Sequence, residues 1–162
     1  EDYKESYAAK SALGGGVLLT QIHPLNYLNF LFGEICKTHI LKHASKSLGI
    51  DVDDTADILI EFASGVSGHV HVDFIQKPRV HRLKVVTDKG RFEWDCHENS
   101  LVFTDMDGEV HDFENNGFER NDMFVAMLSS FISEVNGSES PGFDVTQASR
   151  EMKILLGDTY EK

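Results

Sequence analysis

Three pairs of strand-like segments, each joined by a short turn, constrain the fold of this chain more than any other feature. The pairs are Ala56–Phe62 with Val66–Ile75, Leu83–Thr87 with Arg91–Trp94, and Leu101–Thr104 with Val110–Phe113. Each turn contains a glycine, which readily adopts the positive φ values of tight turns between antiparallel strands. Three consecutive hairpins predict an antiparallel meander.

Helical periodicity appears on both sides of these strands. Segments Arg120–Val135 and Val145–Tyr160 follow them, and helices are also expected over residues 24–32 and Tyr3–Leu13, with Ile35–Ser47 as a strand that leads back across the sheet. The 162 residues are interpreted as a single α+β domain, because this length supports one substantial core. We expect a large, predominantly antiparallel sheet with helices packed on one face.

Charge and hydropathy exclude several classes of protein. The chain has 15 basic and 27 acidic residues, a formal net charge of -12, which repels polyphosphate and argues against nucleic-acid binding. No apolar run reaches the roughly 18 residues needed to span a bilayer, and the first residues lack the charged and apolar regions of a signal peptide, so we expect no targeting to a membrane. Cys36 and Cys96 are poor support for an oxidising compartment, so we interpret both as reduced in a cytoplasmic protein.

The segment Gly14–Gly33, GGGVLLTQIHPLNYLNFLFG, has the character of a functional site. Its glycine triplet allows another chain segment or a ligand to approach closely. Pro24 suits a first helical position and Gly33 a C-cap, which places His23 at the entrance of a helix. The partial positive charge there favours a neutral imidazole, so His23 is a candidate general base; the alternative is a histidine that caps the helix or is hydrogen-bonded in the core.

A continuous helical count through this segment separates two faces. At about 100° per residue, one side carries Thr20, His23, Asn26, Tyr27 and Phe30, and the other carries Leu18, Ile22, Leu25, Leu28 and Phe32. The first side is expected to face a cleft.

The same segment resembles the signature that opens the C-terminal domain of the Gfo/Idh/MocA family, which includes relatives of glucose-fructose oxidoreductase and inositol dehydrogenase. The strands from Asp53 to Asp95, the helix with Asn121, Met123 and Phe124, and a last helix from Asp144 are also similar to that family. The resemblance covers nearly the whole chain. It implies that an N-terminal Rossmann domain binds the nicotinamide cofactor and supplies a lysine, whereas this domain supplies the histidine, here His23.

Two positions near His23 depart from the pattern that the resemblance implies. Relatives usually have carboxylates where this chain has Thr20 and Asn26. The Asn26 amide can hydrogen-bond a sugar hydroxyl but cannot accept its proton, so Asn26→Asp is expected to restore the charge usual in relatives. We expect Thr20, Asn26 and Tyr27 to bind substrate, with Lys77 as a minor candidate for an anionic group or, alternatively, a solvent-facing loop residue.

Two hypotheses for function follow from the resemblance. The first is the substrate-binding and oligomerisation domain of an oxidoreductase that acts on a sugar, inositol or related polyol, with NAD or NADP bound mainly by an N-terminal domain outside this chain. The second is a non-catalytic ligand-binding or assembly module on the same scaffold. The chain contains no GxGxxG after a predicted strand, so we expect the isolated domain neither to hold the cofactor nor to be active.

A His-x-His pattern marks one of the predicted strands. His69, His71 and Asp73 point to one face about 7 Å apart along a strand and resemble part of a metal site. A metal would need a third or fourth ligand from residues such as Asp95, His97 or His81. The sequence does not place these residues beside the histidines, so we predict no metal. The favoured interpretation is a polar sheet face that is half-solvated or buried against another subunit. The resemblance favours the second of these, because it implies a homo-oligomer through the open sheet face.

Two further groups are interpreted as structural. The acidic residues Asp51, Asp53, Asp54 and Asp57 lack the glycine and the last acid of a calcium loop, which predicts a solvated loop. The apolar residues Met123, Phe124, Met127 and Phe131 recur at helical spacing, which predicts a helix packed on the sheet.

Overall fold

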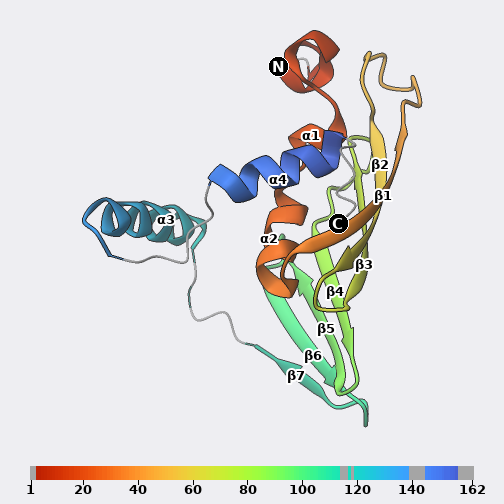
Figure 1. Cartoon of the computed structure of the whole chain (residues 1–162). Coiled ribbons are helices and arrows are strands. Elements are labelled where there is room, and N and C mark those ends of the chain that lie inside the picture. The colour runs from red at the N-terminus through yellow and green to blue at the C-terminus, as the bar shows by residue number, and fades with distance from the viewer. Residues whose placement is uncertain (1–2, 114–116, 118, 139–144, 157–162) are drawn as a thin grey trace. The chain divides into compact units, whose positions relative to one another are not determined.

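The computed structural model describes residues 3–113, 117, 119–138 and 145–156. It confirms an α+β fold with antiparallel strand pairing, but the strands form two sheets instead of one: sheet A, with strand order β1-β2-β3, and sheet B, with order β4-β5-β6-β7 (Figure 1). The chain divides into two compact units, unit 1 with residues Glu1–Ile75 and Phe143–Lys162 and unit 2 with Gln76–Gly142. Sheet A belongs to unit 1 and sheet B to unit 2.

Unit 1 combines short helical turns, three α-helices and sheet A. Its elements are the 3₁₀ turns η1 (Tyr3–Glu5), η2 (Tyr7–Ala9) and η3 (Ser11–Leu13), the helices α1 (Val17–Thr20), α2 (His23–Phe32) and α4 (Val145–Leu156), and the strands β1 (Ile35–His43), β2 (Thr55–Phe62) and β3 (Ser67–Asp73). The stretch Tyr3–Leu13 is therefore a series of 3₁₀ turns, not one helix. Asp144 and the end of the predicted last helix lie outside the described residues.

The helices of unit 1 gather on one face of sheet A (Figure 1). Strand β2 alternates strictly, and its inward residues Ala56, Ile58, Ile60 and Phe62 are at most 4% exposed. Helix α1 contacts β2, β3 and α4, and the ring of Phe32 on α2 lies 5.5 Å from that of Phe62. The period-two pattern thus turns one face of the sheet into the core of unit 1 and leaves the opposite face exposed.

Unit 2 contains the remaining strands and helix α3. Its elements are β4 (Arg82–Thr87), β5 (Gly90–Asp95), β6 (Ser100–Asp105), β7 (Val110–Asp112) and α3 (Arg120–Val135). The antiparallel registers of β2 with β3, β4 with β5 and β6 with β7 confirm the three predicted hairpins. The rings of Phe92 and Phe103 on adjacent strands lie 4.6 Å apart and supply apolar contact within sheet B.

Helix α3 has the predicted bounds but not the predicted packing. Its N-terminus is set locally, because Glu119 and Asp122 form a reciprocal capping box. The residues Met123, Phe124, Met127 and Phe131, expected in the core, are 47% to 64% exposed. Helical periodicity therefore predicted the helix correctly but was wrong about its burial. Among the described residues, no helix has the length and apolar character needed to cross a membrane.

Candidate functional site

The glycine triplet is shaped by neighbouring chain segments. A Cβ at Gly15 would lie 2.6 Å from the carbonyl oxygen of Ala8, and one at Gly16 would lie 2.6 Å from Oδ1 of Asp53. The Leu18 N–H donates to Oδ2 of Asp53 at 3.0 Å, so the same carboxylate caps the start of α1. The sequence allowed close approach of either a ligand or another chain segment to the glycines. At Gly15 and Gly16 it is another segment of the chain that approaches.

The acidic residues before β2 lie in a loop that is held by hydrogen bonds to other parts of the chain. Asp51 accepts hydrogen bonds from the N–H and hydroxyl of Ser11, at 3.1 and 2.6 Å. Asp54 is only 1% exposed and accepts from the Ser45 N–H. Burial opposes ionisation of Asp54, but the hydrogen bonds from Ser45 prevail and lower its pKa. Residues 51–54 thus form the predicted loop, but Asp54 is buried instead of solvated because its carboxylate accepts hydrogen bonds from Ser45.

A break in the helix separates Thr20 from His23. Helix α1 ends at Thr20, Gln21 adopts φ -109 and ψ 42, and α2 starts at His23. The Thr20 hydroxyl donates to the Gly16 carbonyl oxygen at 2.8 Å within its own helix. The continuous helical count is therefore wrong across this break, and Thr20 does not share a helical face with His23.

His23 occupies the expected place at the entrance of α2. It is the first residue of the helix and is followed by Pro24, and Gly33 forms the predicted C-cap with φ 89. Leu25 and Leu28, which are 1% and 7% exposed, hold the opposite side of the helix in the core. The His23 side chain is exposed, so a buried core histidine does not describe it. An exposed imidazole at this position is accessible to a ligand.

Asn26, one turn further along α2, contacts a buried carboxylate that sequence reasoning missed. Its Nδ2 donates to Oε2 of Glu151 on α4, and Nδ2 of Asn29 donates to Oε1 of Glu151 at 3.1 Å. Glu151 is 2% exposed. Burial raises the pKa of Glu151, although the hydrogen bonds from Asn29 and Asn26 act in the opposite direction.

A signal for Glu151 exists in the sequence. It lies at helical spacing from Ala148, Ile154 and Leu155, so a carboxylate interrupts the apolar stripe of an amphipathic helix. A charged side chain in such a stripe is buried only when other groups hydrogen-bond to it. The pattern therefore predicts polar partners for Glu151 on a neighbouring element.

The remaining predicted substrate ligands are dispersed. Tyr27 follows Asn26 on α2 and is half-buried, whereas Lys77 is exposed and belongs to unit 2. Helix α2 thus carries His23, Asn26 and Tyr27 together, and Thr20 lies on the preceding helix.

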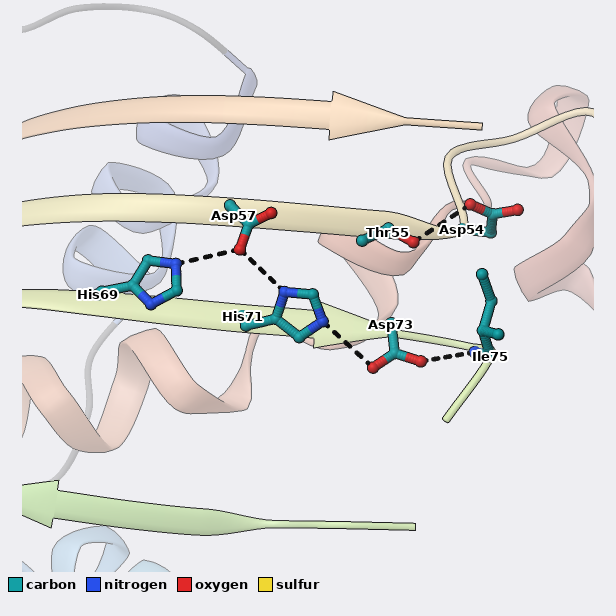
Figure 2. A network of polar contacts seen from close by, with 7 residues as sticks. All are labelled: Asp54, Thr55, Asp57, His69, His71, Asp73 and Ile75. Atoms are coloured by element: carbon teal, nitrogen blue, oxygen red, sulfur yellow. Dashed lines mark hydrogen bonds and ion pairs between the residues drawn. The ribbon is translucent and has the colours of Figure 1, made fainter. Parts of the chain in front are cut away.

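The exposed face of sheet A carries the His-x-His pattern in a polar network (Figure 2). Oδ1 of Asp57 lies 3.0 Å from Nε2 of His69 and 2.8 Å from Nδ1 of His71, and Nε2 of His71 lies 3.4 Å from Oδ2 of Asp73. The hydrogen bond with His71 lowers the pKa of Asp57, and the same bond raises the pKa of His71. The imidazoles of His69 and His71 thus contact carboxylates. The possible further metal ligands Asp95, His97 and His81 belong to unit 2.

Another group of metal-ligand type lies in the turn between β6 and β7. Ligand atoms of Asp105, Glu109 and His111 lie within 4.8 Å of one another among the described residues. Oδ1 of Asp105 already accepts the N–H groups of Asp107 and Glu109, so its position is explained by the turn. This exposed group is not assigned a metal.

A hollow in the described surface lies on sheet A. Residues of all three strands line it, including Lys37, Leu59, Glu61 and His69. It borders the polar network, and His23 is not among its lining residues.

Comparisons with known proteins give one family and many structures. A family model described as the GFO/IDH/MocA C-terminal domain matches residues 1–93. No curated protein matches the chain by sequence.

Solved structures of oxidoreductases share the fold. An NAD-binding oxidoreductase from Klebsiella pneumoniae superposes with a TM-score of 0.80 at 17% identity, over 93% of this chain and 50% of that chain. A levoglucosan dehydrogenase in complex with NADH and levoglucosan gives 0.75 at 16% identity, over 94% and 49%. A UDP-N-acetylglucosamine 3-dehydrogenase from Acidithiobacillus ferrooxidans gives 0.70 at 15% identity, over 83% and 42%. The chain thus spans about half the length of these structures or less.

Proposed function

The chain belongs to the GFO/IDH/MocA C-terminal domain family, and from this we propose that it is the substrate-binding domain of a nicotinamide-dependent oxidoreductase acting on a sugar, inositol or related polyol. The observation that carries the proposal is the exposed His23 at the start of α2, with Asn26 and Tyr27 on the same helix. Two structurally similar proteins are named as dehydrogenases of carbohydrate compounds, which supports this substrate class.

The cofactor, NAD or NADP, is assigned to another domain of the parent protein. Every strand pair that the described residues form is antiparallel, which does not fit the parallel dinucleotide-binding sheet. The nicotinamide supplies the acceptor or donor of the hydride. In the direction of alcohol oxidation, the His23 imidazole accepts the proton of the substrate hydroxyl, and Asn26 and Tyr27 orient the polyol.

A non-catalytic ligand-binding or assembly module remains the second candidate, and one observation favours it. The Thr20 hydroxyl donates to the Gly16 carbonyl and the Asn26 amide donates to Glu151, so both positions that replace the usual carboxylates have intramolecular partners. Such a module would retain the scaffold without a general base.

Replacing His23 separates the two candidates. In the parent protein, His23→Ala should lower kcat by about 10²- to 10⁴-fold, the usual loss for a positioned proton acceptor. The thermal midpoint should stay within about 1 °C, because surface substitutions rarely change stability much and His23 is exposed. Steady-state kinetics and thermal unfolding measure both quantities, with the exposed His97→Ala of unit 2 as the matched control. Undiminished turnover in His23→Ala would overturn the assignment of the base.

We further propose that a second copy of the chain covers the exposed face of sheet A. Leu41 and Leu59 on adjacent strands of this face are 61% and 55% exposed, and the surrounding side chains are polar. Sedimentation at micromolar concentration should show a dimer or larger species, and Leu59→Asp should shift it towards monomer, because a charge would then be buried at the interface. A monomer in the unaltered protein would contradict this assembly.

A further inference from the structure

Glu151 is a buried carboxylate that the proposed reaction does not use. It is 2% exposed on α4, and both of its oxygens accept hydrogen bonds from side-chain amides of α2. The salt bridges found among the described residues include none to Glu151, so the amides of Asn26 and Asn29 are its observed partners. When a buried carboxylate has no counter-charge, its neighbours must donate hydrogen bonds to it.

That requirement fixes the orientation of the Asn26 amide. An ionised carboxylate only accepts hydrogen bonds, so the NH₂ group of Asn26 must face Glu151. The carbonyl oxygen Oδ1 is then the group that Asn26 retains for another partner. Since Asn29 donates to the other oxygen of Glu151, the carboxylate is also held in place and cannot rotate freely to release Asn26.

We propose that Glu151 is a positioning residue that makes Asn26 a hydrogen-bond acceptor toward substrate. The inference rests on the proposed function, in which Asn26 contacts the polyol. With its NH₂ group held by Glu151, Asn26 selects a substrate that donates an O–H at this point. An ether oxygen at the same point offers only an acceptor, which would face the Oδ1 of Asn26 without a hydrogen bond.

Glu151→Gln tests this role because the substitution keeps the shape and removes the charge. A glutamine side chain has one NH₂ group and one oxygen, so it can pair with either end of the Asn26 amide and no longer dictates its orientation. In the parent protein, myo-inositol and D-glucose are compared as substrates with their mono-O-methyl ethers. For the wild type, KM should rise about 3- to 10-fold when the hydroxyl that faces Asn26 is methylated, as for the loss of one neutral hydrogen bond.

In Glu151→Gln this discrimination should fall to less than about 2-fold, while kcat for the unmodified polyol stays within about 2-fold, because the base is untouched. Glu98→Gln, at an exposed position of unit 2, is the matched control and should retain wild-type discrimination. Thermal unfolding verifies that both variants are folded.

A second readout is independent of turnover. In protein labelled at asparagine with ¹⁵N, the side-chain NH₂ signals of Asn26 and Asn29 should shift with pH at one shared midpoint, that of Glu151, and this shift should vanish in Glu151→Gln. An Asn26 signal that ignores Glu151, or discrimination that survives Glu151→Gln, overturns the inference. If the amide signals respond but the wild type oxidises neither myo-inositol nor D-glucose, the proposed function fails and the positioning of Asn26 stands.

Discussion

Two carboxylates of unit 1 lie in opposite environments. Glu151 on α4 is 2% exposed and faces two neutral amides, whereas the side chain of Asp57 on β2 is 41% exposed and faces two imidazoles. Burial raises the pKa of Glu151, while the hydrogen bond with His71 lowers the pKa of Asp57. At Glu151 the two neutral amides do not offset the desolvation of the carboxylate, whereas the imidazole partners of Asp57 at the surface favour its ionised form.

The two sites therefore respond to pH in opposite directions. Glu151 has a raised native pKa, so its contribution to stability is fully present below its ordinary pKa of 4.5 and is lost as pH rises through the native value. Asp57 has a lowered native pKa, so its contribution is lost as pH falls through that value. His71 has a raised native pKa, so its contribution to stability is lost as pH rises through that value. The network therefore stabilises the protein only between the native pKa of Asp57 and that of His71.

The largest expected effect comes from Asn26→Asp. This substitution places a second carboxylate against Glu151 and removes a donor, so the free energy of unfolding at pH 7 should fall by about 3 kcal/mol. Like charges raise the pKa of the pair, so much of this loss should be regained on acidification to about pH 5. Urea unfolding of the chain at both pH values measures the change.

The double variant Asn26→Asp/Glu151→Gln is the matched control. It exchanges the amide and the carboxylate, restores a donor between them, and should recover most of the lost stability at pH 7. If Asn26→Asp alone is as stable as the wild type, Glu151 and Asn26 are not coupled. The expectation that Asn26→Asp restores the charge usual in relatives stays a prediction, and the contact with Glu151 adds an expected cost in stability.

A smaller effect is expected from Asp57→Asn. Without the carboxylate, the pKa of His71 should return towards its ordinary value of 6.5, and the free energy of unfolding should change by less than about 1 kcal/mol because the pair is exposed. Proton NMR of the imidazole measures the pKa. In the wild type, about 0.5 M NaCl should shift the His71 pKa in the same direction by screening and should leave the buried Glu151 titration nearly unchanged. Equal salt sensitivity at both sites would erase the contrast between them.

Several features of the structure follow from short-range patterns in the sequence. The three hairpins, the bounds of α3, the C-cap at Gly33 and the position of His23 at the start of α2 all follow from turn residues, periodicity and capping within a few positions. These local signals, together with the family signature around His23, were sufficient for the fold class and for the candidate base. The substrate roles of Thr20, Asn26, Tyr27 and Lys77 stay predictions.

Which side chains meet depends on the packing of segments that are distant in the sequence. Asn26 and Glu151 are 125 positions apart, and no periodicity within α2 or α4 specifies that the two helices lie against each other there. The approach of Gly16 to Asp53 is likewise set by packing between distant segments, and the exposure of the apolar side of α3 depends on which segments pack against it. Local pattern fixes the faces of an element, whereas the partner of each face depends on how the whole chain excludes water and satisfies its buried polar groups.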